Sequence, residues 1–191
     1  INASQVYRST LGQDVHVGPY AHIRPKCQVG DRCQVGAFVQ IKNCVPDHDT
    51  KMSHLTYVGD ADVGHHVNFG CGTITSNYDG FKKYRTVIGD NVFVGCNTNL
   101  VPPVTVGDGA YIAAGTTVTR DVEPDSLTIG RVRQETKPGW AKKRRELNGK
   151  YDTQFAAWND ISLPPENDFL RRSSHEYKTG LLKTVQAFNY G

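Results

Sequence analysis

A six-residue repeat limits the possible folds of this chain more than any other feature. Nine of its fifteen repeat residues are followed directly by glycine, and most have a small or β-branched residue two positions earlier. Residues two apart on a strand point the same way, so each hexad gives one large and one small side chain to a single interior. The repeat residues form three runs: Leu11, Val17, Ile23, Val29, Val35 and Ile41; Tyr57, Val63 and Phe69; and Ile88, Val94, Leu100, Val106, Ile112 and Val118.

A period of six does not match a helix and predicts short strands joined by corners. At each corner the glycine indicates a positive φ or a crowded backbone. Coils of such strands, stacked on one another, form a parallel β-helix. The alternative is an antiparallel sandwich of short strands, but that fold would show variable spacing and hairpin dipeptides.

The repeat predicts a β-helix domain over residues 1–137, followed by a helix at 138–149 that caps the lower end of the stack. Pro138 suits a first helical turn, and Asn148 with Gly149 suits a helix stop. Residues 150–191 lose the pattern and form a tail, in which 169–188 suit an amphipathic helix. Because the repeat starts almost at Ile1 and no Met precedes it, we expect this chain to be cut from a longer polypeptide.

Composition narrows the possible classes of protein. A net charge of +3 does not call for nucleic acid, and no apolar run of about 18 residues is long enough to span a membrane. The start of the chain is polar and unlike a secretory signal. Five cysteines without CxxC spacing argue against a disulfide framework and a thiolate zinc site, and favour the cytoplasm. His65 and His66 are adjacent, so on a strand they would point to opposite faces and not bind a metal together.

The segment from Ser53 to Lys83 interrupts the repeat and holds most of the groups able to do chemistry. Residues 75–87 are rich in turn formers and predict a loop that projects from a corner. His54 is a natural general base at neutral pH. Arg24, Lys42 and Lys83 lie near the edge of the repeat and, together with His54, are suited to hold a phosphate.

Several motifs resemble one family of hexapeptide-repeat acyltransferases: SHLTYVGDADVG from Ser53, VNFGCGTITSNYDG from Val67, TVIGDNVFVG from Thr86 and IAAGTTVTRDV from Ile112. The family is the acetyltransferase domain of the bacterial bifunctional N-acetylglucosamine-1-phosphate uridylyltransferase and glucosamine-1-phosphate N-acetyltransferase. The match covers roughly residues 11 to 140. The presence of the motifs HLTY and NYDG at this separation is the most specific feature of the resemblance.

The resemblance implies a left-handed parallel β-helix that forms a homotrimer, with acetyl-CoA lying in the groove between neighbouring chains. It implies acetyl transfer to the amino group of glucosamine 1-phosphate, for UDP-N-acetylglucosamine synthesis and hence peptidoglycan and lipid A, with no metal required by this domain. The uridylyltransferase half would precede Ile1.

Carried over by position, the family's roles fall on twelve residues. His54 matches the catalytic base, which takes a proton from the sugar amine. The sugar-phosphate positions are matched by Arg24, Lys42, Tyr57, Asn68 and Lys83. Those that contact acetyl-CoA are matched by Cys71, whose backbone N–H would face the developing oxyanion, and by Asn77, Tyr78, Cys96, Ala114 and Arg131.

Two residues depart from the family pattern. Gln40 stands where an acidic residue is expected to steer His54 or the substrate amine. Cys96 stands where serine is usual, which weakens one hydrogen bond to the coenzyme and leaves an oxidisable thiol.

Four alternatives stay open at this point. Cys71 is the candidate for a covalent mechanism, and the acceptor could be another amine. The domain could also be a non-catalytic scaffold that trimerises an upstream domain. A zinc hydratase on the same fold would need three histidines converging across the groove, and their spacing offers no obvious set.

Overall fold

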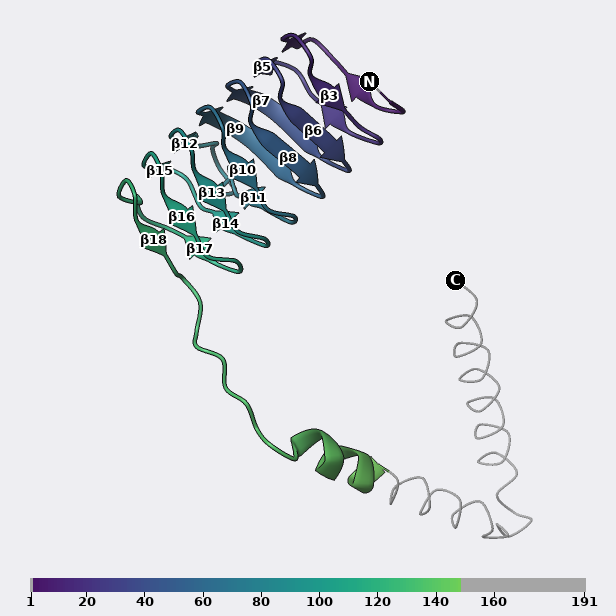
Figure 1. Ribbon diagram of the computed structural model, residues 1–191, viewed down its shortest axis with the longest axis vertical. Coiled ribbons are helices and arrows are strands. Elements are labelled where there is room, and N and C mark those ends of the chain that lie inside the picture. The colour runs from purple at the N-terminus through teal and green to yellow at the C-terminus, as the bar shows by residue number, and fades with distance from the viewer. Residues whose placement is uncertain (1, 149–191) are drawn as a thin grey trace, which may run out of the picture. The chain divides into compact units, whose positions relative to one another are not determined.

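The computed structural model describes residues 2–148 of the 191-residue chain. The chain divides into two compact units, Ile1–Arg133 and Gln134–Gly191. In the first unit short strands pair in parallel, and each coil contributes one strand to each of three faces (Figure 1). The left-handed parallel β-helix predicted from the repeat and the resemblance is confirmed.

Three columns of paired strands make the three faces. The first face contains β1 (Gln5–Val6), β4 (His22–Ile23), β7 (Gln40–Pro46), β9 (Tyr57–Val63), β11 (Ile74–Thr75), β14 (Asn99–Leu100) and β17 (Thr117–Val118). The second contains β2 (Thr10–Leu11), β5 (Gln28–Val29), the later halves of β7 and β9, β12 (Thr86–Ile88) and β15 (Val104–Val106). The third contains β3 (His16–Val17), β6 (Gln34–Ala37), β8 (Lys51–His54), β10 (Asn68–Phe69), β13 (Phe93–Val94), β16 (Tyr111–Ile112) and β18 (Leu127–Thr128).

Neighbouring coils are offset by a nearly constant distance along the sequence. Asn43 and Asp60, which meet across two coils, are 17 positions apart, and Ser9 and Cys27 are 18 apart. Across the inserted loop the offset grows to 25 positions, as between His65 and Asp90. The extra residues form the loop predicted between Thr75 and Val87, so the insertion leaves the stack of coils unbroken on both sides.

The core is a continuous column of apolar side chains, and it corrects one residue of the predicted repeat. Tyr57 was expected to point inward, but Val58 pairs with Ile41 and is 0% exposed, whereas Tyr57 is only partly buried. The column also includes Met52, at 0% exposure. The repeat therefore continues through this region. The coil from Ile41 to Val58 is one residue shorter than the coil before it, and this moves the inward-pointing position from Tyr57 to Val58.

Crowding explains most of the glycines that follow the inward residues. A Cβ on Gly36 would lie 2.1 Å from the carbonyl oxygen of Ser53 in the next coil. Of these nine glycines only Gly18 has a positive φ. Left-handed backbone falls instead on corner residues such as Asp14, Asn43 and Asp60, and asparagine and aspartate tolerate it better than other residues with side chains.

In the second unit residues 140–148 are helical and exposed, while 138 and 139 form a turn. This agrees with the helix predicted at 138–149, which starts two residues later than expected. Its role as a cap stays a prediction, and the tail at 150–191 with its predicted amphipathic helix lies outside the described residues. Over residues 2–148 we find no helix with the length and apolarity to span a bilayer.

Candidate active site

Four predicted residues occupy the same position in successive coils, at the corner where the third face turns into the first. They are His54, Cys71, Cys96 and Ala114, and we call this row the His54 edge. The register of the preceding strands sets the row, since Lys51 pairs with Asn68, Asn68 with Phe93, and Phe93 with Tyr111. The fold thus aligns the predicted base with three predicted coenzyme positions.

Backbone contacts bind successive coils along the His54 edge. The carbonyl of Cys71 accepts a hydrogen bond from Asn97 N at 2.8 Å, and that of Cys96 accepts one from Gly115 N at 2.8 Å. Arg131 Nε donates to the carbonyl of Ala114 at 2.8 Å. Arg131, the last predicted coenzyme residue, therefore lies at the end of the same row.

The reactive groups of the His54 edge are accessible. His54 ends β8 with an exposed side chain, and its carbonyl accepts a hydrogen bond from Thr56 Oγ1 at 2.7 Å. Among the described residues, no protein atom accepts a hydrogen bond from the N–H of Cys71, Cys96 or Ala114. An unpaired N–H at Cys71 is the kind of donor that stabilises an oxyanion.

A second predicted group forms at the corner where the first face turns into the second. We call Arg24, Lys42 and Lys83, with the carboxylate of Asp60, the cation corner. Contact with the Lys83 ammonium is the main cause that lowers the pKa of Lys42, followed by partial burial; the charge of Arg24 adds to it and that of Asp60 opposes it. Cations that repel one another in the free protein favour an anion bound between them.

Asp60 ties the cation corner to the neighbouring coils. It is only 8% exposed, and its carboxylate accepts hydrogen bonds from Asn43 Nδ2 at 2.5 Å and from Asn77 Nδ2. Burial acts to raise the pKa of Asp60, but these two amides and the charges of Lys42 and Lys83 outweigh it and lower the pKa. Asp60 is therefore an anion in a site otherwise formed by cations.

The inserted loop is fixed at both ends. Asn77, 7% exposed, reaches Asp60 at its start, and Arg85 pairs with both carboxylate oxygens of Asp62 at its end. Inside the loop Asp79 Oδ1 accepts the N–H groups of Phe81 and Lys82 at 2.8 Å each. An isolated antiparallel bridge joins Tyr78 to Lys83. The loop is thus a defined hairpin rather than a loose insertion.

The two remaining residues predicted to bind the substrate lie on different faces. Tyr57 is on the first face, and its hydroxyl lies 3.5 Å from Asn77 Nδ2, close to the cation corner. Asn68 is on β10 in the third face. Gln40 pairs with Tyr57 across the first face. Within one chain, then, the structure joins Tyr57 to the cation corner and leaves Asn68 apart.

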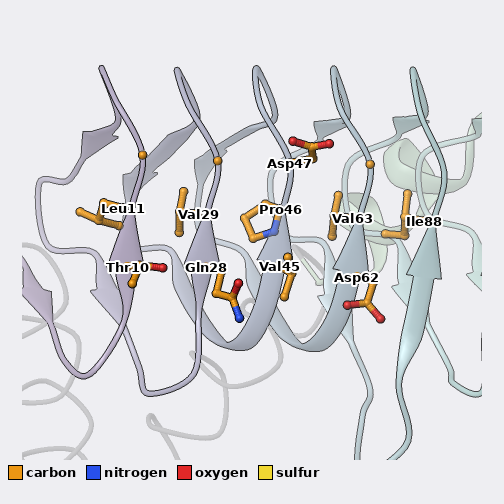
Figure 2. A pocket seen from close by; sticks show the side chains of 13 residues that line it. Thr10, Leu11, Gln28, Val29, Val45, Pro46, Asp47, Asp62, Val63 and Ile88 are labelled. Carbon is orange, nitrogen blue, oxygen red and sulfur yellow. The ribbon is translucent and has the colours of Figure 1, made fainter.

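A groove of about 580 Å³ runs along the second face, lined by Leu11, Val29, Val63, Asp62 and neighbouring residues (Figure 2). None of the predicted site residues lines it. Apart from Asn68, the predicted site residues lie at or near the two corners that bound the first face, so this groove lies outside the candidate site.

Sequence reasoning missed Asp60 and Asn43. Both sit at corners with positive φ, of 51° and 45°, where Asp and Asn are ordinary turn residues. The coil length was the signal that would have found them. Lys42 pairs with Gly59, so the next residues, Asn43 and Asp60, hold equivalent positions in successive coils beside the predicted cations.

Comparisons with known proteins agree with the fold. The family model "Bacterial transferase hexapeptide (six repeats)" matches residues 8–43 and 85–120. Both matched segments are thus hexapeptide repeats, and they lie within the β-helix. Among solved structures, PerB from Caulobacter crescentus in complex with CoA and GDP-perosamine has a TM-score of 0.53 at 22% identity, covering 62% of this chain and 58% of that one. A mutant of AntD, an N-acyltransferase from Bacillus cereus, in a complex that contains coenzyme A, has a TM-score of 0.57 at 15% identity, covering 78% and 91%.

Sequence relatives are much nearer. The chain is 49% identical over 144 residues to the bifunctional protein GlmU of Caldicellulosiruptor saccharolyticus, and 51% identical over 142 residues to that of Listeria monocytogenes. These matches cover 75% and 74% of this chain. It spans 31% of the length of each of these two relatives.

Proposed function

We propose that this chain transfers an acetyl group from acetyl-CoA to the amino group of glucosamine 1-phosphate, giving CoA and N-acetylglucosamine 1-phosphate. The observation that carries the proposal is the His54 edge, in which an accessible imidazole heads a row of the predicted coenzyme residues. Identity of about half to GlmU proteins and a fold shared with a CoA-bound N-acyltransferase support it.

His54 is the general base in this mechanism. It removes the proton from the sugar amine as the nitrogen attacks the thioester carbonyl, and the negative charge that develops on the carbonyl oxygen faces the N–H of Cys71. Collapse of the tetrahedral intermediate breaks the carbon–sulfur bond and releases CoA. The acyl group passes directly to nitrogen, so the Cys71 thiol takes no covalent part.

The cation corner supplies the phosphate site. Arg24, Lys42 and Lys83 balance the two negative charges of the sugar phosphate, and Tyr57 lies beside them. Asn77 and Tyr78 present the loop to the thioester end of acetyl-CoA.

His54 and Asn68 belong to the third face, whereas the cation corner lies at the far end of the first face. We therefore expect one site to combine the third-face residues of one chain with the cation corner of a neighbouring chain, so the active form is a homotrimer with the coenzyme between two subunits. We place the enzyme in the cytoplasm, because five free cysteines suit a reducing compartment.

The test measures CoA release with glucosamine 1-phosphate as acceptor. We expect His54→Ala to lose about 10²- to 10⁴-fold in rate, whereas Cys71→Ala keeps most of the activity. A His54→Ala enzyme near wild type would refute the mechanism. A better acceptor without phosphate would refute the role of the cation corner.

Two binding measurements complete the test. Titration of the chain with acetyl-CoA in a calorimeter should give a heat of binding. The absence of a heat signal would favour the alternative of a non-catalytic scaffold. Sedimentation should give a trimer. A stable monomer would leave the coenzyme groove with one wall and contradict the proposed site.

A further inference from the structure

A cluster of three histidines occupies the corner where the second face turns into the third, away from both corners of the candidate active site. His48 and His65 hold equivalent positions in successive coils, and His66 N donates to the carbonyl of His48 at 3.1 Å. His66 has a φ of 53°. The expectation that His65 and His66 point to opposite faces is therefore wrong, because strand alternation does not apply at a left-handed corner.

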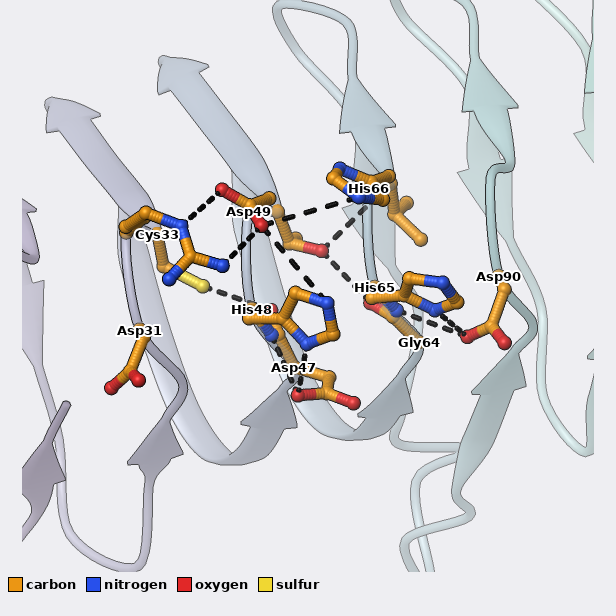
Figure 3. Close-up of polar contacts among 12 residues, drawn as sticks. Asp31, Cys33, Asp47, His48, Asp49, Gly64, His65, His66 and Asp90 are labelled. Atoms are coloured by element: carbon orange, nitrogen blue, oxygen red, sulfur yellow. Dashed lines mark hydrogen bonds and ion pairs between the residues drawn. The ribbon is translucent and has the colours of Figure 1, made fainter. Parts of the chain in front are cut away.

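The three imidazoles converge, as Figure 3 shows. One ligand nitrogen from each of His48, His65 and His66 lies within 4.8 Å of the others. Three atoms this close lie within about 2.8 Å of a common centre, and zinc–nitrogen bonds are about 2.0–2.1 Å long. Side-chain rotations that move each nitrogen by less than about 1 Å would complete the coordination. The side chains are 39%, 30% and 53% exposed, so an ion can reach them.

Carboxylates orient two of these rings. Asp47 Oδ1 lies 3.0 Å from His48 Nδ1, and Asp90 Oδ1 lies 2.7 Å from His65 Nδ1 (Figure 3). A ring that donates its Nδ1 proton to a carboxylate presents the Nε2 lone pair to a metal, and this pairing is usual for metal-bound histidine.

A third carboxylate lies beside the point of convergence. Asp49 Oδ2 is 4.0 Å from His48 Nε2 and 4.0 Å from His66 Nε2, while the guanidinium of Arg32 holds the same carboxylate. Asp49 thus adds negative potential at the place where a cation would sit.

We propose that His48, His65 and His66 bind one divalent transition-metal ion, such as zinc, that joins two successive coils. Three imidazole nitrogens suit zinc, copper or nickel and not magnesium or calcium, which take oxygen ligands. Three protein ligands leave a fourth position for water. The ion is separate from the acetyl-transfer machinery, and its effect is to fasten neighbouring corners of the β-helix.

The experiment uses the metal-free chain without a histidine tag. Calorimetric titration with zinc chloride should show one ion per chain, and zinc should raise the thermal midpoint by several degrees. His65→Asn should weaken zinc binding at least tenfold, and Asp90→Asn by about 10- to 100-fold through its effect on His65. His16→Asn, an exposed histidine outside the cluster, is the matched control and should bind zinc like wild type.

Circular dichroism checks that each variant is folded, and binding of Co²⁺, read from its visible absorption, reports ligand geometry independently of stability. Binding that weakens at least tenfold in His65→Asn and is unchanged in His16→Asn supports the site. No binding by the wild-type chain, or equal binding by His65→Asn, overturns it. CoA release is no part of this readout, so failure here leaves the acetyl-transfer proposal untouched.

Discussion

Replacing Asp60 with asparagine tests whether one buried carboxylate holds the cation corner and the inserted loop together. Asp60 has a φ of 51°, a conformation that asparagine adopts as readily as aspartate. The substitution therefore keeps the backbone and nearly the same side-chain shape, and what it removes is one negative charge and one hydrogen-bond acceptor.

The expected loss follows from the contacts of the carboxylate. Asn43 and Asn77 each donate to one of its oxygens, and Lys42 and Lys83 lie close enough to lower its pKa. An asparagine offers one acceptor oxygen, so one of the two amides loses its partner and meets another amino group. A hydrogen bond to a charged group contributes about 1.5–3 kcal/mol, and we expect Asp60→Asn to destabilise the fold by roughly that amount.

The pH dependence of this loss has a defined sign. Burial raises the pKa of Asp60, but the two amides and two ammonium groups bring it below the ordinary value. A carboxylate whose pKa is lowered by folding stabilises the fold above its unfolded pKa of about 3.9, and that contribution is lost as the pH falls through the folded pKa. The gap between wild type and Asp60→Asn should be full at pH 7 and should close in acid.

Urea denaturation, followed by circular dichroism at one fixed protomer concentration, measures the loss. The matched control is Asp14→Asn, because Asp14 also has a positive φ, of 53°, but its side chain is exposed. The control should stay within about 0.5 kcal/mol of wild type. The reasoning is refuted if Asp60→Asn behaves like the control at pH 7, or if its loss is the same in acid.

Three further substitutions have outcomes that the structure fixes. Lys42→Met removes the repulsion between Lys42 and Lys83, so the thermal midpoint should stay the same or rise. The KM for glucosamine 1-phosphate should rise about tenfold or more, because one cation of the proposed phosphate site is lost. A fall in stability with unchanged KM would contradict that site. Arg85→Lys cannot reproduce the paired contact with Asp62 together with the hydrogen bonds to the carbonyls of Asn43 and Ala61, so urea denaturation should show a loss of about 1–2 kcal/mol. Gly36→Ala places a Cβ against the Ser53 carbonyl and should cost about 1–3 kcal/mol by the same measurement, and a neutral result would mean that the coils part easily.

The fold was predictable because many residues along the chain follow the same six-residue period. Large and small positions such as Ile23 and Ala21 are buried together in most coils, as the hexads require, while Leu11 and Val15 near the start are only partly buried. The error at Tyr57 has a physical cause, since no rule in the sequence says which coil is shorter than the coil before it. Only the pairing of Ile41 with Val58 reveals the shift.

The arrangement of the site was predictable in part, while the roles of its residues stay predictions. The motifs HLTY and NYDG predicted roles for His54 and for the loop, and the structure aligns His54 with the predicted coenzyme positions and gathers the three cations. Asp60 was missed because aspartate is an ordinary turn residue, so its presence at a corner does not by itself indicate a functional role. Its chemical importance depends on burial, which no single-residue pattern records.

The coil length supplies the missing step between sequence and site. Positions separated by one coil length are neighbours across the stack, and this spacing separates His48 from His65, His54 from Cys71, and Asp60 from Asn77. A search of the sequence at offsets of 17 and 18 would have included these pairs among its candidates, and the structure shows which offset applies to each coil. It would not have shown the hydrogen bonds that the rings of His48 and His65 donate to Asp47 and Asp90, because those depend on side-chain rotamers at the corner. In this β-helix, therefore, the coil length indicates which residues are neighbours across the stack. The chemistry of the histidine pair depends on the carboxylates of Asp47 and Asp90, which orient the rings.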